Sequence, residues 1–134
     1  MEKIWDPLRK REVALTPEEK VRQWLIAQLK DFAAVPVHQM MSEVELEYSS
    51  GKVYRADLVI YGRAGIPLAI AECKRPEIEL TSEVLQQVLR YNMMLNVPWL
   101  ILSNGVSTLV WQLKDTGYTN LNHFPSYSEM LSNQ

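Results

Sequence analysis

Apolar and polar positions along the chain alternate in patterns that predict two long helices. Between Thr16 and Phe32 the apolar residues recur at three- and four-residue spacing, and Thr16 followed by Pro17 and two glutamates is typical of a helix start. A second helix is predicted from Thr81 to about residue 96, before a proline at 98. The predicted inward stripe of the first helix is Val21, Trp24, Leu25, Gln28, Leu29 and Phe32.

Three strands are predicted between these helices. Residues 43–48 alternate strictly, and residues 53–61 and 66–72 are rich in β-branched and aromatic side chains. Short turns join the three segments, so they should form antiparallel hairpins. The continuous apolar run 99–102 is typical of a strand buried on both faces, and residues 108–113 form a further strand.

The order of these elements predicts the fold class. A helix separates the strand at 66–72 from the strand at 99–102, and a strand, helix, strand unit favours one parallel pairing. We therefore predict an α/β fold with a mixed sheet of about five strands, in which antiparallel hairpins are followed by a helix crossover.

The two ends of the chain are expected to be accessory to this unit. Residues 1–15 mix charges with Trp5 and Leu8 without a clean period, which predicts an arm whose Trp5 docks on the rest of the protein. Residues 16–113 should form the main domain. The polar segment 114–134 is expected to be an extension that packs on the same domain through a short final helix.

Composition and charge narrow the function classes. With 134 residues and 47% hydrophobic content the chain is expected to form one domain with one core. A net charge of -2 argues against nucleic-acid binding by bulk electrostatics alone. Residues 51–75 are nevertheless net positive, which predicts a face that a phosphate backbone could approach; its basic residues are Lys52, Arg55, Arg63, Lys74 and Arg75.

A cytoplasmic location without membrane association is expected. The single cysteine, Cys73, excludes an internal disulfide and is predicted to be reduced and buried. No apolar stretch is long enough for a signal peptide or a membrane span.

The candidate chemistry lies on two neighbouring strands, at Asp57 and at Glu72-Cys73-Lys74. If Tyr61 pairs with Ile66 across the connecting turn, Asp57 is diagonal to Glu72 on one face, roughly 7 to 8 Å away. Side chains alternate along a strand, so Lys74 shares that face with Glu72 and Cys73 points away. Two carboxylates and a lysine are thus predicted to converge.

Such a set is suited to phosphodiester hydrolysis. Mg²⁺ needs oxygen ligands and keeps several waters, so Asp57, Glu72 and the backbone carbonyl of Cys73 would be sufficient, with Mn²⁺ as a substitute. A bound cation acidifies water and offsets charge on the phosphate, and Lys74 could orient that water. The alternative is a surface ion-pair ladder. Apolar neighbours on the same predicted face favour a pocket instead; they are Val53, Val59, Leu68 and Ile70.

Two further positions are candidates for the site. Glu18 extends the apolar stripe of the first helix and could supply a third acid, with Glu19 as its more solvent-facing neighbour. Gln87 and Tyr91 are four residues apart, so they share one face of the second helix.

Four motifs occur in an order and spacing that resemble the PD-(D/E)XK nuclease superfamily. They are Arg55-Ala56-Asp57-Leu58-Val59, Ala71-Glu72-Cys73-Lys74, Gln87-Val88-Leu89-Arg90-Tyr91 and Leu102-Ser103-Asn104-Gly105. Together with the opening at residues 16–23, they resemble more narrowly the N-terminal nuclease domain of type I restriction enzyme R subunits, over residues 16–113.

This resemblance implies a restriction-endonuclease-like α/β/α core that binds magnesium and cuts double-stranded DNA. It implies that Asp57, Glu72 and Lys74 are catalytic and that Glu18, or Glu19 in its place, lies near the metal. It also implies that Gln87 and Tyr91 border the site and that Arg55, in the first motif, supports the site or the substrate.

Two departures from the family pattern matter. Alanine rather than proline precedes Asp57, and no ATPase motor or specificity region follows, so a motor or specificity subunit is an expected partner. A compact nuclease that cuts both strands of a duplex often needs two sites, so a homodimer is one expectation. A Mg²⁺-dependent deoxyribonuclease is the leading interpretation, although the residues are equally compatible with RNA. The alternatives are a non-catalytic nucleic-acid-binding or assembly module and a purely structural scaffold.

Overall fold

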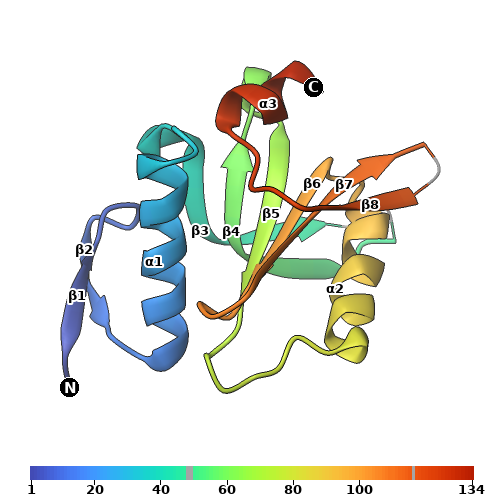
Figure 1. Cartoon of the computed structure of the whole chain (residues 1–134). Helices are drawn as coiled ribbons and strands as arrows, with labels where there is room; N and C mark the ends of the chain where they lie inside the picture. The colour runs from blue at the N-terminus through green and yellow to red at the C-terminus, as the bar shows by residue number, and fades with distance from the viewer. Residues whose placement is uncertain (48–49, 116) are drawn as a thin grey trace.

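A mixed sheet between two helices forms the body of the protein (Figure 1). The computed structural model describes residues 1–47, 50–115 and 117–134, without the side chains of Tyr91, Met93 and Met94. The six strands lie in sequence order across the sheet. They are β3 (Met40–Glu47), β4 (Val53–Tyr61), β5 (Pro67–Cys73), β6 (Trp99–Ser103), β7 (Thr108–Lys114) and β8 (Gly117–Leu121).

Helices α1 (Pro17–Asp31) and α2 (Ser82–Leu95) cover opposite faces of this sheet, and they are separated by it in Figure 1. One hydrophobic cluster joins α1 to the sheet through Leu25, Leu58 and Ile101. A second cluster, which includes Val59, Ile70 and Val88, lies on the α2 side. The predicted α/β/α class is therefore confirmed, with one more strand in the sheet than expected.

Local signals in the sequence set the helix boundaries. The hydroxyl of Thr16 accepts a hydrogen bond from the Glu19 amide at 3.1 Å and caps α1. Thr81 caps α2 in the same way, and that helix ends at Asn96, whose φ of 59° is left-handed. Short helix α3 (Tyr127–Ser132) packs back on the α1-side cluster, and 3-10 turns η1 (Val37–Gln39) and η2 (Arg63–Gly65) precede β3 and β5.

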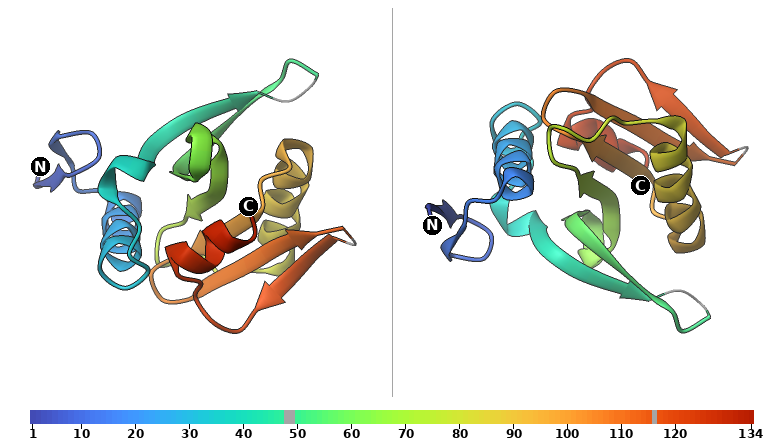
Figure 2. Two further views of the ribbon diagram at one scale, coloured as in Figure 1. Left: turned by 90° about the horizontal axis from the view of Figure 1, so that it is seen from above. Right: turned by 90° about the horizontal axis from the view of Figure 1, so that it is seen from below.

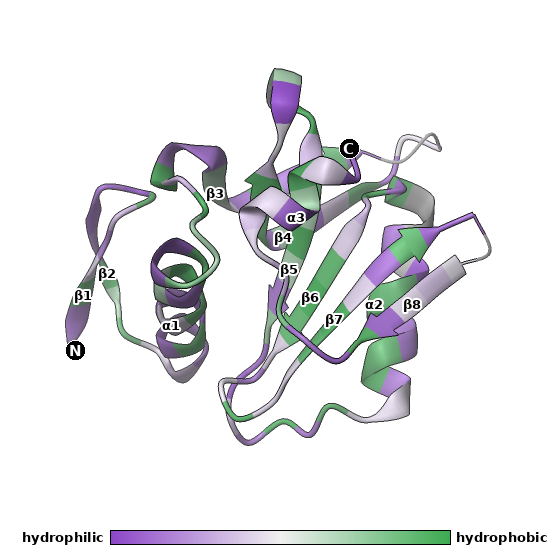
Figure 3. Ribbon diagram, turned by 45° about the horizontal axis from the view of Figure 1, so that its top comes forward, coloured by the Kyte–Doolittle hydropathy of each residue, from purple (hydrophilic) through white to green (hydrophobic). Residues whose placement is uncertain are grey.

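The central strands are the most buried, and Figure 3 shows hydrophobic positions concentrated along β5 and β6. These two strands pair in parallel, with Glu72 opposite Leu102 and Cys73 opposite Ser103, and every other pairing in the sheet is antiparallel. The predicted single parallel pair with α2 as its crossover is confirmed. Strand β3 begins three residues earlier than predicted, and its last predicted residue, Tyr48, lies outside the described residues.

The predicted register between β4 and β5 is wrong by two residues. Leu58 pairs with Ala71 and Val59 with Ile70, after an irregularity at Ile60 and Tyr61. The connection between the two strands is longer than the predicted four-residue loop, because it contains the 3-10 turn η2. Residues expected to pair next to a tight loop therefore belong to the connection. A register shift of two residues leaves each side chain on its predicted face of the sheet. If the observed register continues by one more pair, Asp57 lies directly opposite Glu72.

The buried face of α1 is rotated relative to the predicted stripe. Trp24 is 40% exposed and Phe32 is 79% exposed, whereas Ile26 and Arg22 are buried. Arg22 can occupy this face because carboxylates surround it, as described below. A periodicity read from apolar residues alone misses a buried arginine.

Two elements are absent from the sequence prediction. Residues expected to form an arm make an antiparallel hairpin of β1 (Lys3–Asp6) and β2 (Arg11–Ala14), which lies outside α1 in both views of Figure 2. Trp5 was expected to dock, but it is 55% exposed. Edge strand β8 is the other addition. Among the described residues, no helix is both long and apolar enough to cross a membrane.

The packing of α1 predicts a clear difference between two isoleucines. Ile26→Ala empties a fully packed position under α1 and should lower the free energy of unfolding by about 2 to 5 kcal/mol. The exposed Ile66 is the matched control, and Ile66→Ala should change it by less than about 1 kcal/mol. Urea denaturation at pH 7 measures both. Equal losses would show that α1 does not cover a continuous core.

Candidate functional site

The two candidate carboxylates lie on adjacent strands at one end of the sheet. Asp57 Oδ2 accepts a hydrogen bond from the backbone amide of Cys73 at 2.7 Å, which ties β4 to β5 at this level. Glu72 precedes Cys73 on β5, and Lys74 directly follows that strand. The structure places Asp57 and Glu72 at the same end of adjacent strands, where the register continued by one pair sets them opposite each other and not on the predicted diagonal. The convergence of their carboxylates on one ion stays a prediction.

Glu72 is a buried carboxylate, with 8% of its surface exposed. Burial, and to a smaller extent the nearby charge of Glu18, raise the pKa of Glu72 to about 7 against the opposing effects of Lys74 and Arg22. The hydroxyl of Tyr54 donates a hydrogen bond to Glu72 Oε1. A carboxyl that titrates near neutrality is suited to exchanging protons or to accepting a cation.

Asp57 shares this environment. Burial is the main cause that raises the pKa of Asp57, and the Cys73 amide, Arg22 and Lys74 act against it. Among the described residues, neither Asp57 nor Glu72 forms an ion pair. The positive charges of Arg22 and Lys74 therefore act on the two desolvated carboxylates without a direct ion pair to either.

The chain after Lys74 is fixed by the loop between β6 and β7. The Lys74 amide donates to the carbonyl of Ser103 at 2.8 Å. Asn104 Nδ2 donates to the carbonyl of Ile78 at 2.9 Å, and its Oδ1 accepts from the amides of residues 106 and 107. A Cβ at Gly105 would lie 3.4 Å from Val21 on α1. The loop thus connects the end of β5 to the start of α1.

The roles of the two glutamates at the start of α1 are partly reversed from expectation. Glu19, predicted to face solvent, is buried and accepts from Arg9 at 2.7 Å and from Gln23 at 3.0 Å. Glu18 is half-buried, and its charge raises the pKa of both Glu72 and Cys73. Glu19 is thus held in ion pairs, while the charge of Glu18 acts on the Glu72 side of the site.

Other predicted site residues are placed less centrally. Arg55 is largely exposed and pairs with Glu43 at 3.1 Å. Gln87 is exposed on α2, where it lines a shallow depression with Glu83, Gln86 and Arg90. The side chain of Tyr91 lies outside the described residues, so the pairing of Gln87 with Tyr91 stays a prediction.

The predicted basic face does not form as one surface. Arg63 lies at the turn between β4 and β5 and donates to the carbonyl of Leu131 at 3.2 Å, next to α3. Arg75 pairs with Glu77 at 3.1 Å. The apolar neighbours predicted to share the carboxylate face are divided as well, because Leu68 packs on the α1 side and Val53 is exposed. The burial of Asp57 and Glu72 therefore does not come from one shared apolar face made by these four neighbours.

The donor atoms at this site fit a hard divalent cation. Mg²⁺ takes one or two carboxylates and completes its shell with waters and substrate oxygens. Within residues 1–47, 50–115 and 117–134, no three side chains of His, Cys, Asp or Glu are grouped to hold a metal ion by themselves. The fit therefore rests on Asp57 and Glu72, with the carbonyl of Cys73 beside them and Glu18 farther out.

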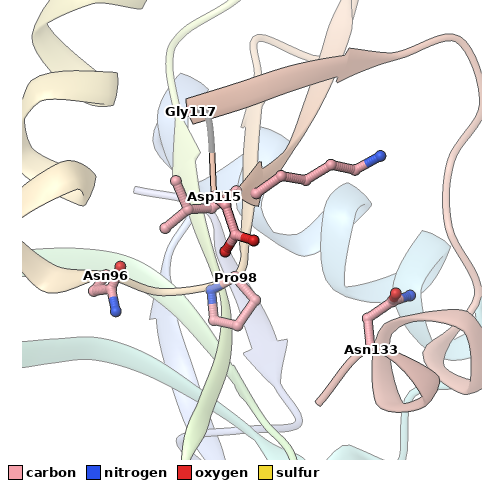
Figure 4. A pocket seen from close by; sticks show the side chains of 7 residues that line it. Asn96, Pro98, Asp115, Gly117 and Asn133 are labelled. Atoms are coloured by element: carbon pink, nitrogen blue, oxygen red, sulfur yellow. The ribbon is translucent and has the colours of Figure 1, made fainter.

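A cavity lies at the other end of the sheet. It measures about 600 Å³ and surrounds the segment before β6, where Asn96, Pro98, Asp115, Gly117 and Asn133 line it (Figure 4). Because Glu72 pairs with Leu102 near the last residue of β6, the length of that strand separates it from this cavity. Asp57, Glu72 and Lys74 therefore do not line this cavity.

Several residues near Asp57 and Glu72 escaped the sequence prediction. Tyr54 reaches Glu72 from three residues before Asp57, and Arg22 donates to the backbone carbonyl of Asp57 at 3.2 Å. One signal for Arg22 was available, since it follows Glu18 by four residues and so shares its helix face. The free thiol of Cys73 is buried, as expected, and burial raises its pKa.

Comparisons with known proteins are consistent with this geometry. The family model described as type I restriction enzyme R protein N terminus (HSDR_N) matches residues 17–125. A fragment assigned as an HsdR subunit of a type I restriction enzyme from Vibrio vulnificus YJ016 superposes with a TM-score of 0.65 and 19% identity, over 90% of this chain and 25% of that chain. A search of curated proteins gave no match.

A second solved structure is also similar. A DrdV–DNA complex superposes with a TM-score of 0.54 and 16% identity, over 78% of this chain and 10% of that chain. The protein thus spans about a quarter of the first relative and about a tenth of the second. Both similarities show a shared fold.

The burial of Glu72 predicts a specific pH dependence of stability. In the unfolded chain the pKa of this carboxyl should be near its ordinary value of 4.5, against about 7 in the folded protein. Between these values only the folded state holds the proton, so the free energy of unfolding falls as pH rises and then levels off. In EDTA, Glu72→Gln should be more stable than the parent at pH 8, by on the order of 3 kcal/mol.

Urea denaturation between pH 4.5 and pH 8 tests this effect. The exposed Glu45 is the control, because Glu45→Gln should keep the pH dependence of the parent. An unchanged pH dependence in Glu72→Gln would show that this carboxylate is solvated.

Proposed function

We propose that this chain, which belongs to the family of type I restriction enzyme R protein N termini, is a Mg²⁺-dependent endonuclease domain that hydrolyses DNA phosphodiester bonds. Asp57 and Glu72 would hold the ion, for which Mn²⁺ could substitute. Lys74 would act beside it. The fold class and the family are those of a nuclease-like domain, and the reaction, its metal and its residues are our proposal.

One observation carries this proposal. Asp57 and Glu72 are desolvated on neighbouring strands, and burial raises the pKa of both carboxyl groups. Burying charge without a partner is costly, so a purely structural sheet would be expected to place apolar residues there. A cation supplied with the substrate accounts for two acids at this position.

The surrounding residues supply orientation. The Cys73 amide holds Asp57 Oδ2 and leaves Oδ1 available, and the Tyr54 hydroxyl fixes Glu72 through Oε1. When bound, the cation would lower the pKa of a water and offset negative charge on the phosphate. Lys74 would donate from Nζ to that water or to a phosphate oxygen. Glu18 would bind outer waters from the start of α1.

DNA is the proposed substrate. One structural relative is a complex with DNA, and the family is named for a restriction enzyme subunit. Because the chain spans only part of its relatives, a motor or specificity subunit is a proposed partner. Arg55, Gln87 and Tyr91 are proposed to contact substrate or support the site, and a homodimer is proposed for cutting both strands.

A second candidate is a non-catalytic module that needs a partner for DNA contact. The net charge of -2 and the dispersed positions of Arg63 and Arg75 favour this alternative. Calorimetric titration with Mn²⁺ separates the two. Measurable binding that is lost in Asp57→Asn supports the nuclease, whereas DNA binding without metal binding supports the module.

Plasmid nicking tests the proposed reaction directly. Asp57→Asn, Glu72→Gln and Lys74→Met should each lower the Mg²⁺-dependent rate by about a hundredfold or more, because each removes a group that acts on the reacting phosphate. Asp115→Asn is the matched control, since it removes a carboxylate from the distant cavity and should retain the parent rate. Circular dichroism checks folding. Full activity in the three site variants would refute the assignment.

A further inference from the structure

The ladder between β3 and β4 is interrupted at the level of the proposed site. Ser42 pairs with Leu58 and Val44 pairs with Ala56, but the intervening Glu43 and Asp57 do not pair. Glu43 has a φ of 54°, in the left-handed region that a residue with a side chain seldom adopts. A feature of this kind persists only where surrounding contacts hold it.

Arg22 contacts both of the residues, Glu43 and Asp57, that do not pair with each other. It is 6% exposed, and its Nη1 donates to the backbone carbonyl of Asp57 at 3.2 Å. Its Nη2 lies 3.5 Å from Glu43 Oε1, which is the residue with the unusual backbone. A single guanidinium therefore connects both residues of the interrupted pair.

One further charge lies against the arginine. Its Nε lies 3.4 Å from Glu19 Oε2 on the same helix, and Glu19 in turn accepts from Arg9 Nη2 at 2.7 Å. Arg9 also pairs with Asp6, which is completely buried at the end of β1. The amino-terminal hairpin in Figure 2 is thus connected to the carbonyl of Asp57 through four alternating charges.

Asp57 is held on its other side by a different contact. Its side-chain Oδ2 accepts from the Cys73 amide, while its main-chain oxygen accepts from Arg22. Fixing both the peptide plane and the carboxylate leaves Oδ1 in one orientation. The buried guanidinium is enclosed by Glu19, Glu43 and Asp57, so it acts on a substrate only through these neighbours.

We propose that Arg22 is a positioning residue, which, anchored by Glu43 and by the hairpin through Glu19, orients the carboxylate of Asp57. The consequence for metal binding and cleavage rests on the function proposed above. The structural part does not, because the hydrogen bond between Cys73 and Asp57 reports the orientation in the metal-free protein.

Arg22→Lys is the informative variant, because it keeps the positive charge between Glu19 and Glu43 but loses the forked donor geometry. Arg63→Lys is the matched control, since Arg63 also donates from Nη1 to a main-chain carbonyl at 3.2 Å, but at the far end of β4. Glu43→Gln provides a second route, because it weakens one anchor and leaves Arg22 in place.

Two measurements on the whole chain test the proposal. In metal-free protein, amide hydrogen exchange at Cys73 should accelerate about tenfold or more in Arg22→Lys and in Glu43→Gln, while the amide of Leu100 in β6 is unchanged. Calorimetry should show Mn²⁺ affinity lowered about tenfold or more in both variants and unchanged in Arg63→Lys.

The outcomes separate the two proposals. Unchanged exchange at Cys73 in both variants overturns the positioning role, whatever the protein does to DNA. Accelerated exchange at Cys73, in a parent that neither binds Mn²⁺ nor nicks plasmid, supports the positioning role and overturns the nuclease. Equal acceleration at Cys73 and Leu100 means loss of the whole sheet and also overturns a local role.

Discussion

Two acidic groups lie out of water at the end of the buried central strands, and the neighbouring contacts are arranged around them. Glu72 belongs to a strand with almost no exposed surface, and Asp57 faces it from the neighbouring strand. Moving such groups out of water opposes folding. The compensating contacts come from a main-chain amide, a tyrosine hydroxyl and nearby positive charges, none of which neutralises either acid directly.

The positive charges lie near the two acids without pairing directly with their carboxylates. Arg22 binds the main chain of Asp57 and is itself neutralised by glutamates, while Lys74 is kept close by the backbone contact to Ser103. This arrangement lowers the electrostatic cost of the acids without occupying their oxygens. A direct salt bridge to Asp57 or Glu72 would occupy the oxygens that the proposed cation needs.

Sequence patterns predicted the helices and strands of the main domain better than they predicted how these elements pack, pair and contact one another. Thr16 and Pro17 defined the start of α1 because capping is a local interaction. The buried face of that helix was misjudged because burial of Arg22 depends on Glu43, which is distant in sequence. The amino-terminal hairpin was missed for the same reason, since Arg9 connects it to Glu19 and its strands carry few apolar residues. For the site, the identity and shared face of Asp57 and Glu72 followed from strand alternation, whereas the register and the supporting residues did not.

The single parallel pair of strands has a consequence for how the site is assembled during folding. Asp57 and Glu72 come together through hairpins that close over short stretches of chain, and such contacts form early. The Lys74 amide instead donates to Ser103, a contact that requires α2 to cross the sheet and β6 to pair with β5. The two acids thus depend on contacts that are local in sequence, whereas the position of the lysine backbone depends on the long crossover.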